Sequence, residues 1–326
     1  MKISSTNLLP ELPPDTKPLQ HQIGGHFYGN PKTKFGILQR CSTGVVLKPF
    51  INEVRGKSEW RFYDDVFSDQ APESFYALRP FLAAPLGIYQ YNEINYLVLE
   101  NIVQKFVHPC IADIKIGRIT YDFQAKNIVQ KFVHPCIADI KIGRITYDFQ
   151  ASKEDIEKCH RRYPPLNEVG FQLLGWQNYN SRKNLYDYHD KTCGRSLTKE
   201  EIIYAIAHFY GAPRSDHRKI VRLVLERLTI LEHIMTKQQG LVFISSSLLI
   251  VYEGENDNEI NLSSEPKFDI RVIDLCKVFK VEQYVDQTGL DDNFLYGLRS
   301  YMNYLRRLLD DTFVYVHIDK LNCINQ

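Results

Sequence analysis

Two identical pairs of an acidic and a basic residue are the feature of this sequence that most directly suggests chemistry. The pattern Pro-x-x-x-Asp-x-Lys-x-Gly occurs twice, once around Asp113 and Lys115 and again around Asp139 and Lys141. Residues two apart in a β-strand point to the same face, so each pair would place a carboxylate beside an ammonium group. In phosphoryl transfer, a carboxylate can orient the attacking hydroxyl while a cation offsets charge on the transferred group. The alternative is a structural ion pair on a half-exposed strand.

Both patterns belong to a perfect tandem duplication. Residues 101–125 recur without a change as residues 127–151. Repeat folds use at least about three diverged units, so two identical copies indicate instead a recent duplication or an error of sequence assembly. The two copies cannot both occupy the same position in the fold, so one of them must be accommodated elsewhere. Accommodating the other as an insertion costs about 1 kcal/mol of loop-closure entropy, and a spare strand-like segment also invites mispairing.

Composition and charge narrow the class of protein. The chain has 326 residues, of which 44% are hydrophobic and 24% charged, as in ordinary globular proteins. The net charge is +1, so no overall positive field attracts nucleic acid, and a bound anion requires a local cluster of cations. No apolar run is long enough for a membrane-spanning helix. We therefore expect a globular protein with neither a transmembrane segment nor a nucleic-acid partner.

Several common catalytic and cofactor motifs are absent. Gly56-Lys57-Ser58 looks like the end of a phosphate-binding loop, but Ile51 stands where that loop has its first glycine. The glycine pattern of dinucleotide folds and the motifs of serine hydrolases and zinc peptidases do not occur either. The seven cysteines lack the spacing of zinc ligands, and we expect most of them to be small, reduced, buried side chains.

The N-terminal third of the chain is expected to form a small lobe. Residues 1–17 contain three prolines and are predicted to be a flexible tail. Residues 18–100 show short apolar runs separated by glycine-containing turns, which predicts strands, with one helix at 58–67. This part is predicted to be an N-lobe that binds a nucleotide, and residues 101–326 to be a larger C-lobe.

The C-terminal part is predicted to be mainly helical, with one strand pair. Thr198 and Glu201 match a capping box that opens a helix. The apolar patterns predict further elements, namely a long amphipathic helix at 216–239, strands within 243–254 and 268–279, and a last helix at 292–310. The sequence therefore predicts a two-lobed α+β protein, with an antiparallel-sheet N-lobe, a larger mixed α/β C-lobe and a nucleotide-sized cleft between them.

Pro-x-x-x-Asp-x-Lys-x-Gly is also the signature of the inositol polyphosphate kinases, and the chain resembles this family over about residues 19–310. Further segments match family motifs in the same order, namely GGHFYGNPKTKFGILQ, YDFQAS with GFQLLGW, CGRSLTKEEI, SSSLLIVYEG and VIDLCKVF. The short substrate segment and the compact size are most similar to the multikinase branch. The resemblance implies the family's two-lobed fold, which is related to ATP-grasp enzymes and protein kinases.

The resemblance implies an ATP site between the lobes. Lys48 would bind the ATP phosphates with Glu59 as its ion-pair partner, because a carboxylate can hold a lysine in place beside phosphates. Glu100 and Asn101 match the hinge, where backbone groups would bind adenine and the side chains the ribose. Asp274 would coordinate Mg²⁺, for which a hard carboxylate is the expected ligand. Ser246 and Ser247 would lie close to that metal.

The same resemblance gives the duplicated motif its role. Asp139 or Asp113 would orient or deprotonate the attacking hydroxyl, and Lys141 or Lys115 would stabilise the phosphoryl group. In the family a substrate-binding helix follows this strand after a short loop. Because only the second copy leads directly into such a helix, the sequence favours Asp139 and Lys141.

An inositol trisphosphate brings about four to six negative charges, so its site should be cationic. The resemblance implies five cations for this site: Arg55, Lys158, Arg161, Arg162 and Lys277. Lys277 replaces a histidine of the family, and Leu275 replaces the phenylalanine of its Ile-Asp-Phe motif. The alternative for the helix at 152–163 is a solvated surface with acid–base pairs four residues apart, such as Glu157 with Arg161.

The resemblance thus implies an ATP- and Mg²⁺-dependent kinase of the multikinase branch. Its substrates would be soluble inositol tris- and tetrakisphosphates, phosphorylated towards the pentakisphosphate, and phosphoinositide lipids are a further candidate substrate. The alternative is an inositol phosphate-binding or scaffold protein whose duplicated strand impairs catalysis. We expect a monomer that resides in the cytoplasm and the nucleus.

Overall fold

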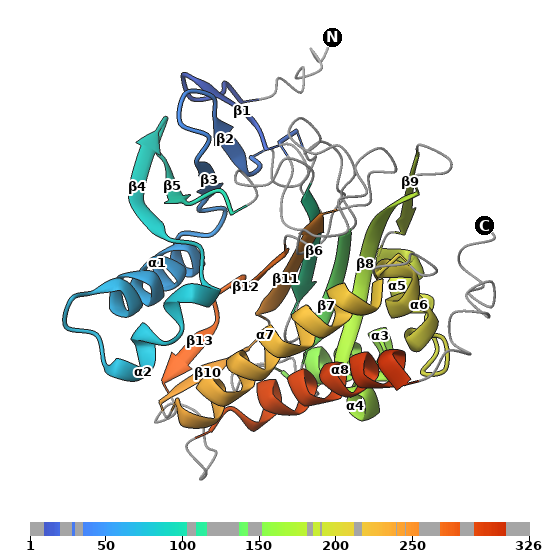
Figure 1. Ribbon diagram of the computed structural model, residues 1–326. Coiled ribbons are helices and arrows are strands. Elements are labelled where there is room, and N and C mark those ends of the chain that lie inside the picture. The colour runs from blue at the N-terminus through green and yellow to red at the C-terminus, as the bar shows by residue number, and fades with distance from the viewer. Residues whose placement is uncertain are drawn as a thin grey trace.

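The computed structural model of the protein describes residues 10–19, 28–29, 35–102, 109–115, 137–142, 152–180, 185–189, 191–211, 217–238, 240–244, 246–253, 268–280 and 290–310. Figure 1 shows a small N-lobe, blue to cyan, above and beside a larger C-lobe. This arrangement confirms the predicted two-lobed α+β architecture. Most of the expected tail, the GGHF part of the first family motif and the YDFQA segments lie outside the described residues.

Five antiparallel strands form the N-lobe sheet in the order β1-β2-β3-β5-β4. In that order their bounds are Thr16–Pro18, Leu38–Arg40, Val46–Pro49, Ile94–Leu99 and Pro85–Tyr91. The sheet thus begins two residues before the expected lobe boundary at residue 18. One face buries a small cluster of Leu38, Leu47 and Tyr96. The opposite face, which carries Lys48 and Leu97 as cross-strand neighbours, packs towards helix α1.

Helix α1 (Glu53–Phe67) begins earlier than the predicted helix at 58–67, because Asn52 caps it by accepting a hydrogen bond from the Arg55 backbone at 3.0 Å. A Cβ atom on Gly56 would lie 2.2 Å from the Phe50 ring, so only glycine allows this close approach of the helix. The Gly-Lys-Ser sequence is therefore explained by packing. The short helix α2 (Glu73–Tyr76) and the 3₁₀ turn η1 (Arg79–Phe81) lead back to β4.

The C-lobe contains the remaining strands in three groups, β12-β11-β6, β7-β8-β9 and β10-β13. In chain order the bounds of β6 to β13 are Pro109–Lys115, Ile137–Ile142, Phe171–Asn180, Leu185–His189, Leu241–Phe243, Ser247–Glu253, Phe268–Ile273 and Val278–Lys280. The predicted strand pair is confirmed as the antiparallel ladder of β11 and β12.

The two copies of the duplication occupy different places in the C-lobe. The strand of the first copy, β6, pairs antiparallel with β11, and the strand of the second copy, β7, pairs antiparallel with β8. Figure 1 shows β6 and β7 next to one another at the centre of the lobe, and they are in contact. The two identical segments therefore hydrogen-bond to different neighbours. Because β6 and β7 are also in contact, they link β11 to β8.

Helices cover the C-lobe sheet, and their bounds from α3 to α8 are Lys153–Arg162, Leu166–Val169, Lys191–Ser196, Ile202–Phe209, His217–Lys237 and Asp292–Asp310. The predicted helices at 216–239 and 292–310 are confirmed as α7 and α8, which lie side by side across the lower part of Figure 1. In the part of the chain that the structure describes, no helix combines the length and the apolar character needed to cross a bilayer.

Local polar contacts define the ends of two of these helices. The reciprocal hydrogen bonds of the predicted capping box are present, because the Thr198 amide donates to the Glu201 carboxylate at 2.9 Å and the Glu201 amide donates to the Thr198 hydroxyl at 3.3 Å. They lie in the turn that leads into α6, which begins at Ile202. Asp291, which is 1% exposed, accepts from the amides of Phe294 and Phe243, so it caps α8 and fastens it to β10.

The two lobes share one continuous apolar core. It joins Phe62 and Tyr63 of α1 to Phe243 of β10 and to residues of α7 and α8. The rings of Phe62 and Phe243 meet edge to face with their centroids 5.9 Å apart. Among the cysteines, Cys41 is exposed and Cys276 half-buried, and both are free thiols, whereas Cys193 is disulfide-bonded. The free thiols of Cys41 and Cys276 agree with the expectation that most cysteines are reduced, Cys193 is an exception to it, and Cys41 is not buried.

Candidate active site

A lysine held between two carboxylates lies where the lobes meet. The Nζ atom of Lys48, on β3, is 2.8 Å from Oε1 of Glu59 on α1. The same atom is 3.2 Å from Oδ1 of Asp274, the residue that follows β12 in the C-lobe. The predicted ion pair of Lys48 with Glu59 is confirmed. The contact with Asp274 was not predicted and joins the proposed phosphate-binding lysine directly to the proposed metal ligand.

The charges of this cluster support one another. Burial by itself would lower the pKa of Lys48, but the carboxylates of Glu59 and Asp274 outweigh that effect and hold the pKa well above its ordinary value. Burial, reinforced by the Glu59 carboxylate, raises the pKa of the neighbouring Tyr63. Lys48 is therefore a permanent cation at physiological pH, which is the property that phosphate binding requires.

Asp274 has a backbone conformation that is uncommon for a residue other than glycine. Its φ angle is +60°, in the left-handed region, where side chains with a Cβ atom are disfavoured. Such conformations persist where the surrounding structure enforces them, and they are concentrated at functional sites. In this conformation the Asp274 carboxylate lies against Lys48. The strain is therefore consistent with a carboxylate held ready for a ligand.

The thiol of Cys276, two residues after Asp274, gives a pH-dependent test of this environment. Burial and the carboxylates of Glu59 and Asp274 raise the pKa of Cys276 to about 11. At pH 8 only about one such thiol in a thousand would be ionised, so alkylation by iodoacetamide should be slow and should accelerate about tenfold per pH unit up to pH 10. Mass spectrometry of labelled peptides measures this rate. The exposed Cys41 is the internal control, and a Cys276 rate that levels off near pH 9 would contradict the described environment.

A divalent cation fits the donors near Asp274. Mg²⁺ is commonly held by one or two carboxylates together with substrate phosphates, so a single well-placed aspartate suffices. The Ser246 and Ser247 hydroxyl groups are fully buried and have no hydrogen-bond partner within the described residues. Ser247 pairs with Ile273, immediately before Asp274, so its hydroxyl oxygen belongs to the same corner of the sheet. In the described part of the chain no group of three or more His, Cys, Asp or Glu side chains that could hold a metal ion occurs.

The predicted hinge is held by contacts within the protein. The Glu100 amide donates to the Ala84 carbonyl at 2.8 Å, and the Ala84 amide donates to the Glu100 carboxylate at 3.1 Å. The Asn101 side chain donates to the carbonyl of Gly44, in the turn before β3, at 3.0 Å. The Glu100 carboxylate also lies 3.9 Å from Arg271. Sequence reasoning missed Arg271, although a charged residue in the apolar strand preceding Asp274 is a visible signal.

Sheet register relates the duplicated motif to the metal corner. Ser247 of β11 pairs with Ile273 on one side and with Lys115 on the other, so the backbone of the first copy lies in one row with the residue before Asp274. The second copy pairs with β8 instead, with Asp139 opposite Gly175. The side chains of both motif strands lie outside the described residues. Chain order favours the second copy as the catalytic strand, because it leads directly into α3. The sheet register favours the first copy for the same role.

The predicted substrate cations are only partly brought to the site. Arg55 is exposed near the start of α1 and is close enough to Cys276 to lower the pKa of its thiol. Lys277 follows in the turn after Asp274 and is half-buried. On α3, Arg161 pairs with Glu157 at 3.5 Å and both side chains are exposed, which is the surface pairing that the alternative interpretation expected. The side chains of Lys158 and Arg162 lie outside the described residues.

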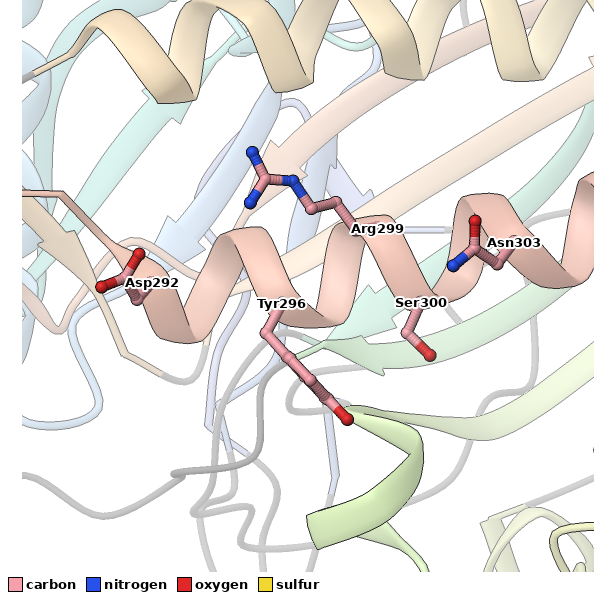
Figure 2. Close-up of a pocket in the computed structure, with 5 residues that line it drawn as sticks. All are labelled: Asp292, Tyr296, Arg299, Ser300 and Asn303. Atoms are coloured by element: carbon pink, nitrogen blue, oxygen red, sulfur yellow. The ribbon is translucent and has the colours of Figure 1, made fainter.

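A shallow hollow on the C-lobe lies apart from this cluster. It has a volume of about 440 Å³ and is lined by Asp292, Tyr296, Arg299, Ser300 and Asn303. Figure 2 shows that all five side chains project from α8. Arg299, the cation among them, is already paired with Glu232 at 2.7 Å. The hollow therefore shares no residue with the Lys48 cluster, and its arginine is neutralised.

Comparison with known protein families and sequences gives one consistent result. A sequence profile described as "Inositol polyphosphate kinase" matches residues 96–127 and 123–306, with one copy of the duplication in each part. The chain is 33% identical over 244 residues to the inositol polyphosphate multikinase of Homo sapiens, covering 73% of this chain and 51% of that protein. It is 24% identical over 251 residues to inositol hexakisphosphate kinase 2 of Mus musculus, covering 68% and 50%. The chain spans about half the length of the curated relatives it matches.

Comparison with solved structures supports the fold. The inositol phosphate multikinase Ipk2 of S. cerevisiae, solved in complex with ADP and Mn²⁺, superposes with a TM-score of 0.56 at 23% sequence identity. The match covers 78% of this chain and 96% of that one. A second inositol phosphate multikinase structure gives a TM-score of 0.53 at 20% identity, covering 77% and 98%. The antiparallel N-lobe and the mixed C-lobe therefore have the same overall fold as these structures.

Proposed function

Because the chain belongs to the inositol polyphosphate kinase family, we propose that it transfers the γ-phosphoryl group of ATP to a hydroxyl group of an inositol polyphosphate. The observation that carries this proposal is the cluster of Lys48, Glu59 and Asp274 between the lobes. It combines a permanent cation for phosphates with a carboxylate for a divalent cation in one place. Phosphoryl transfer depends mainly on such positioning and charge stabilisation.

Each residue of the Lys48 cluster has a separate role in the proposed nucleotide binding. Lys48 binds the phosphates, Glu59 keeps the lysine in place, and Asp274 holds Mg²⁺ with the Ser247 hydroxyl nearby. Mg²⁺ supplies charge neutralisation on the phosphate oxygens when it is bound. The ion pair brings Lys48 and Asp274 together, and with Mg-ATP bound Lys48 would contact the phosphates while Asp274 would contact the divalent cation. The segment around Glu100 and Asn101 contacts the adenosine moiety.

The duplicated motif supplies the groups that act on the substrate. An aspartate accepts the proton of the attacking hydroxyl, whose oxygen bonds to the γ-phosphorus as the bond to ADP breaks, and the lysine two residues on stabilises the transferred group. We assign these roles to Asp113 and Lys115 of the first copy, supported by the pairing of β6 with β11 beside Asp274. Asp139 and Lys141 remain the alternative, supported by chain order.

The relatives support a proposed substrate class. The proposed substrates are soluble inositol tris- and tetrakisphosphates, because the relatives with the higher identity are named inositol polyphosphate multikinases. Arg55 and Lys277, which flank the Lys48 cluster, are the proposed cations for the substrate phosphates. Arg161 and its helical neighbours Lys158 and Arg162 are proposed to contribute further. Phosphoinositide lipids as substrates, and residence in the cytoplasm and the nucleus, stay predictions.

The proposal is tested by Mg²⁺-dependent transfer of ³²P from γ-labelled ATP to inositol 1,4,5-trisphosphate. The chain is compared with a variant that lacks residues 101–126, in which Glu100 is joined to Asn127 and a single motif strand can pair with both β11 and β8. We expect turnover by both proteins. Turnover by the shortened variant alone would mean that the duplication disables a kinase. No turnover by either, with retained inositol phosphate binding, would replace the proposal with a binding protein.

A further inference from the structure

Arg271 is a largely buried cation of the C-lobe that reaches the N-lobe. It lies on β12, three residues before Asp274, and its side chain is 11% exposed. Its guanidinium group forms a fork with the Asp269 carboxylate, with donor–acceptor distances of 3.1 and 3.0 Å. Burying a charge without a partner is costly, so this two-bond pairing with a carboxylate of the same strand stabilises the arginine in the interior.

The remaining contacts of Arg271 go to the segments that connect the lobes. Nη1 donates to the Leu82 carbonyl at 2.6 Å, in the segment between η1 and β4. Nη2 lies 3.9 Å from Oε1 of Glu100, the residue after β5. The two segments are tied to one another by the reciprocal hydrogen bonds of Ala84 and Glu100. One guanidinium group thus contacts both chain segments at the lobe junction.

A second arginine holds the neighbouring turn η1. Arg227 of α7 donates to the Pro80 carbonyl at 3.0 Å and lies over the Phe81 ring, 4.0 Å from its centroid. Burial and the nearby Arg271 lower the pKa of Arg227, while Asp269 raises it. Asp269 therefore acts on both guanidinium groups. The two arginines hold neighbouring residues, Pro80 and Leu82, and they differ in the two-bond pairing with Asp269 and in the contact to Glu100.

We propose that Arg271 is a positioning residue for nucleotide binding, because it holds Leu82 and the Glu100 carboxylate of the hinge against β12, the strand that precedes Asp274. The inference rests on the proposed function. In a two-lobed kinase the adenosine contacts come from the hinge, and the metal and phosphate contacts come from the C-lobe and β3. Arg271 connects these two sets of contacts through one side chain. Loss of Arg271 therefore loosens the hinge relative to Asp274 and weakens nucleotide binding.

The test compares matched variants of the two arginines in the full chain. Arg271→Met combined with Asp269→Asn removes both buried charges together, so no unpaired carboxylate is left in the interior, and Arg227→Met is the control. ADP binding in the presence of Mg²⁺ is measured by calorimetry, and amide hydrogen exchange of Ala84 is followed by NMR or mass spectrometry. Arg271→Lys is a third variant, because a lysine cannot reproduce the fork to Asp269 together with the bond to Leu82.

We expect the Arg271→Met/Asp269→Asn variant to bind ADP at least tenfold more weakly and to exchange the Ala84 amide at least tenfold faster. In kinetics the effect should appear as a raised KM for ATP with kcat changed less than threefold. Arg227→Met should change ADP affinity less than threefold, even though it also lowers Tm. Arg271→Lys should fall between these variants and the unaltered protein.

Two results would overturn the inference. Equal losses of ADP affinity for the Arg271 and Arg227 variants would show that Arg271 is only structural. Unchanged exchange at Ala84 would show that it does not hold the hinge. The failure of the proposed function looks different, because the unaltered protein would then not bind ADP at all, while the exchange experiment would still report on the hinge.

Discussion

Replacing Asp274 with asparagine is expected to lower kcat about 100- to 1,000-fold, because the amide keeps the shape of the side chain but loses the charge that we propose to hold Mg²⁺. The variant also loses the ion pair to Lys48, whose Nζ lies 3.2 Å from the carboxylate. The Mg²⁺ or Mn²⁺ concentration needed for half-maximal activity should therefore rise as well. Steady-state assays across a metal titration measure both effects.

The matched control for Asp274 is a carboxylate that also pairs with a lysine but lies on the surface. Glu168 pairs with Lys199 at 2.7 Å, and its side chain is 69% exposed. Exposed pairs contribute little, so Glu168→Gln should leave the kinetics unchanged. If Asp274→Asn retained full activity with an unchanged metal requirement, Asp274 would not be the metal ligand, and its contact with Lys48 would be purely structural.

Replacing Asp113 with asparagine is expected to lower turnover about 100-fold or more, whereas Asp139→Asn should change it less than threefold. The reason is the sheet order, in which β6 of the first copy pairs with β11 beside Asp274 while β7 of the second copy pairs with β8. Loss of a general base typically lowers rates by about 10² to 10⁴. Initial-rate assays with inositol 1,4,5-trisphosphate compare the two variants directly.

The two aspartates are controls for each other, because the substitution, the flanking sequence and the strand type are identical. A large loss for Asp139→Asn alone would assign catalysis to the second copy, as the chain order favours. Equal large losses would mean that both copies contribute to one site. Equal small losses would mean that neither aspartate is the general base, and that Lys48 and Asp274 contribute most to catalysis.

Periodic patterns in the sequence predicted the elements whose stability is local or strongly amphipathic. The apolar stripe of α7 and the span of α8 are visible in the chain because a helix buries residues at intervals of three and four. The capping box of Thr198 and Glu201 is equally local. Helix α1 was predicted too short, since its first turn depends on the Asn52 cap and on close packing of Gly56 against Phe50.

The candidate site could be predicted only in part. The family motifs led to Lys48, Glu59 and Asp274 as separate residues, and to the pairing of Lys48 with Glu59 eleven positions away. The contact of Lys48 with Asp274 spans 226 positions and is created by the packing of α1 against the C-lobe. Arg271 was missed for the same reason, because its partners Leu82 and Glu100 lie in the other lobe.

By itself the sequence determined the family, the types of the reactive groups and the helices with strong periodicity, because these depend on residue identity and on neighbours a few positions apart. The tertiary structure alone decided how the two copies of the motif differ. Residues 101–125 and 127–151 are identical, so their intrinsic strand propensities are identical too. Their distinct places arise from the strands beside them, β11 for the first copy and β8 for the second, since strand pairing is a contact between distant parts of the chain.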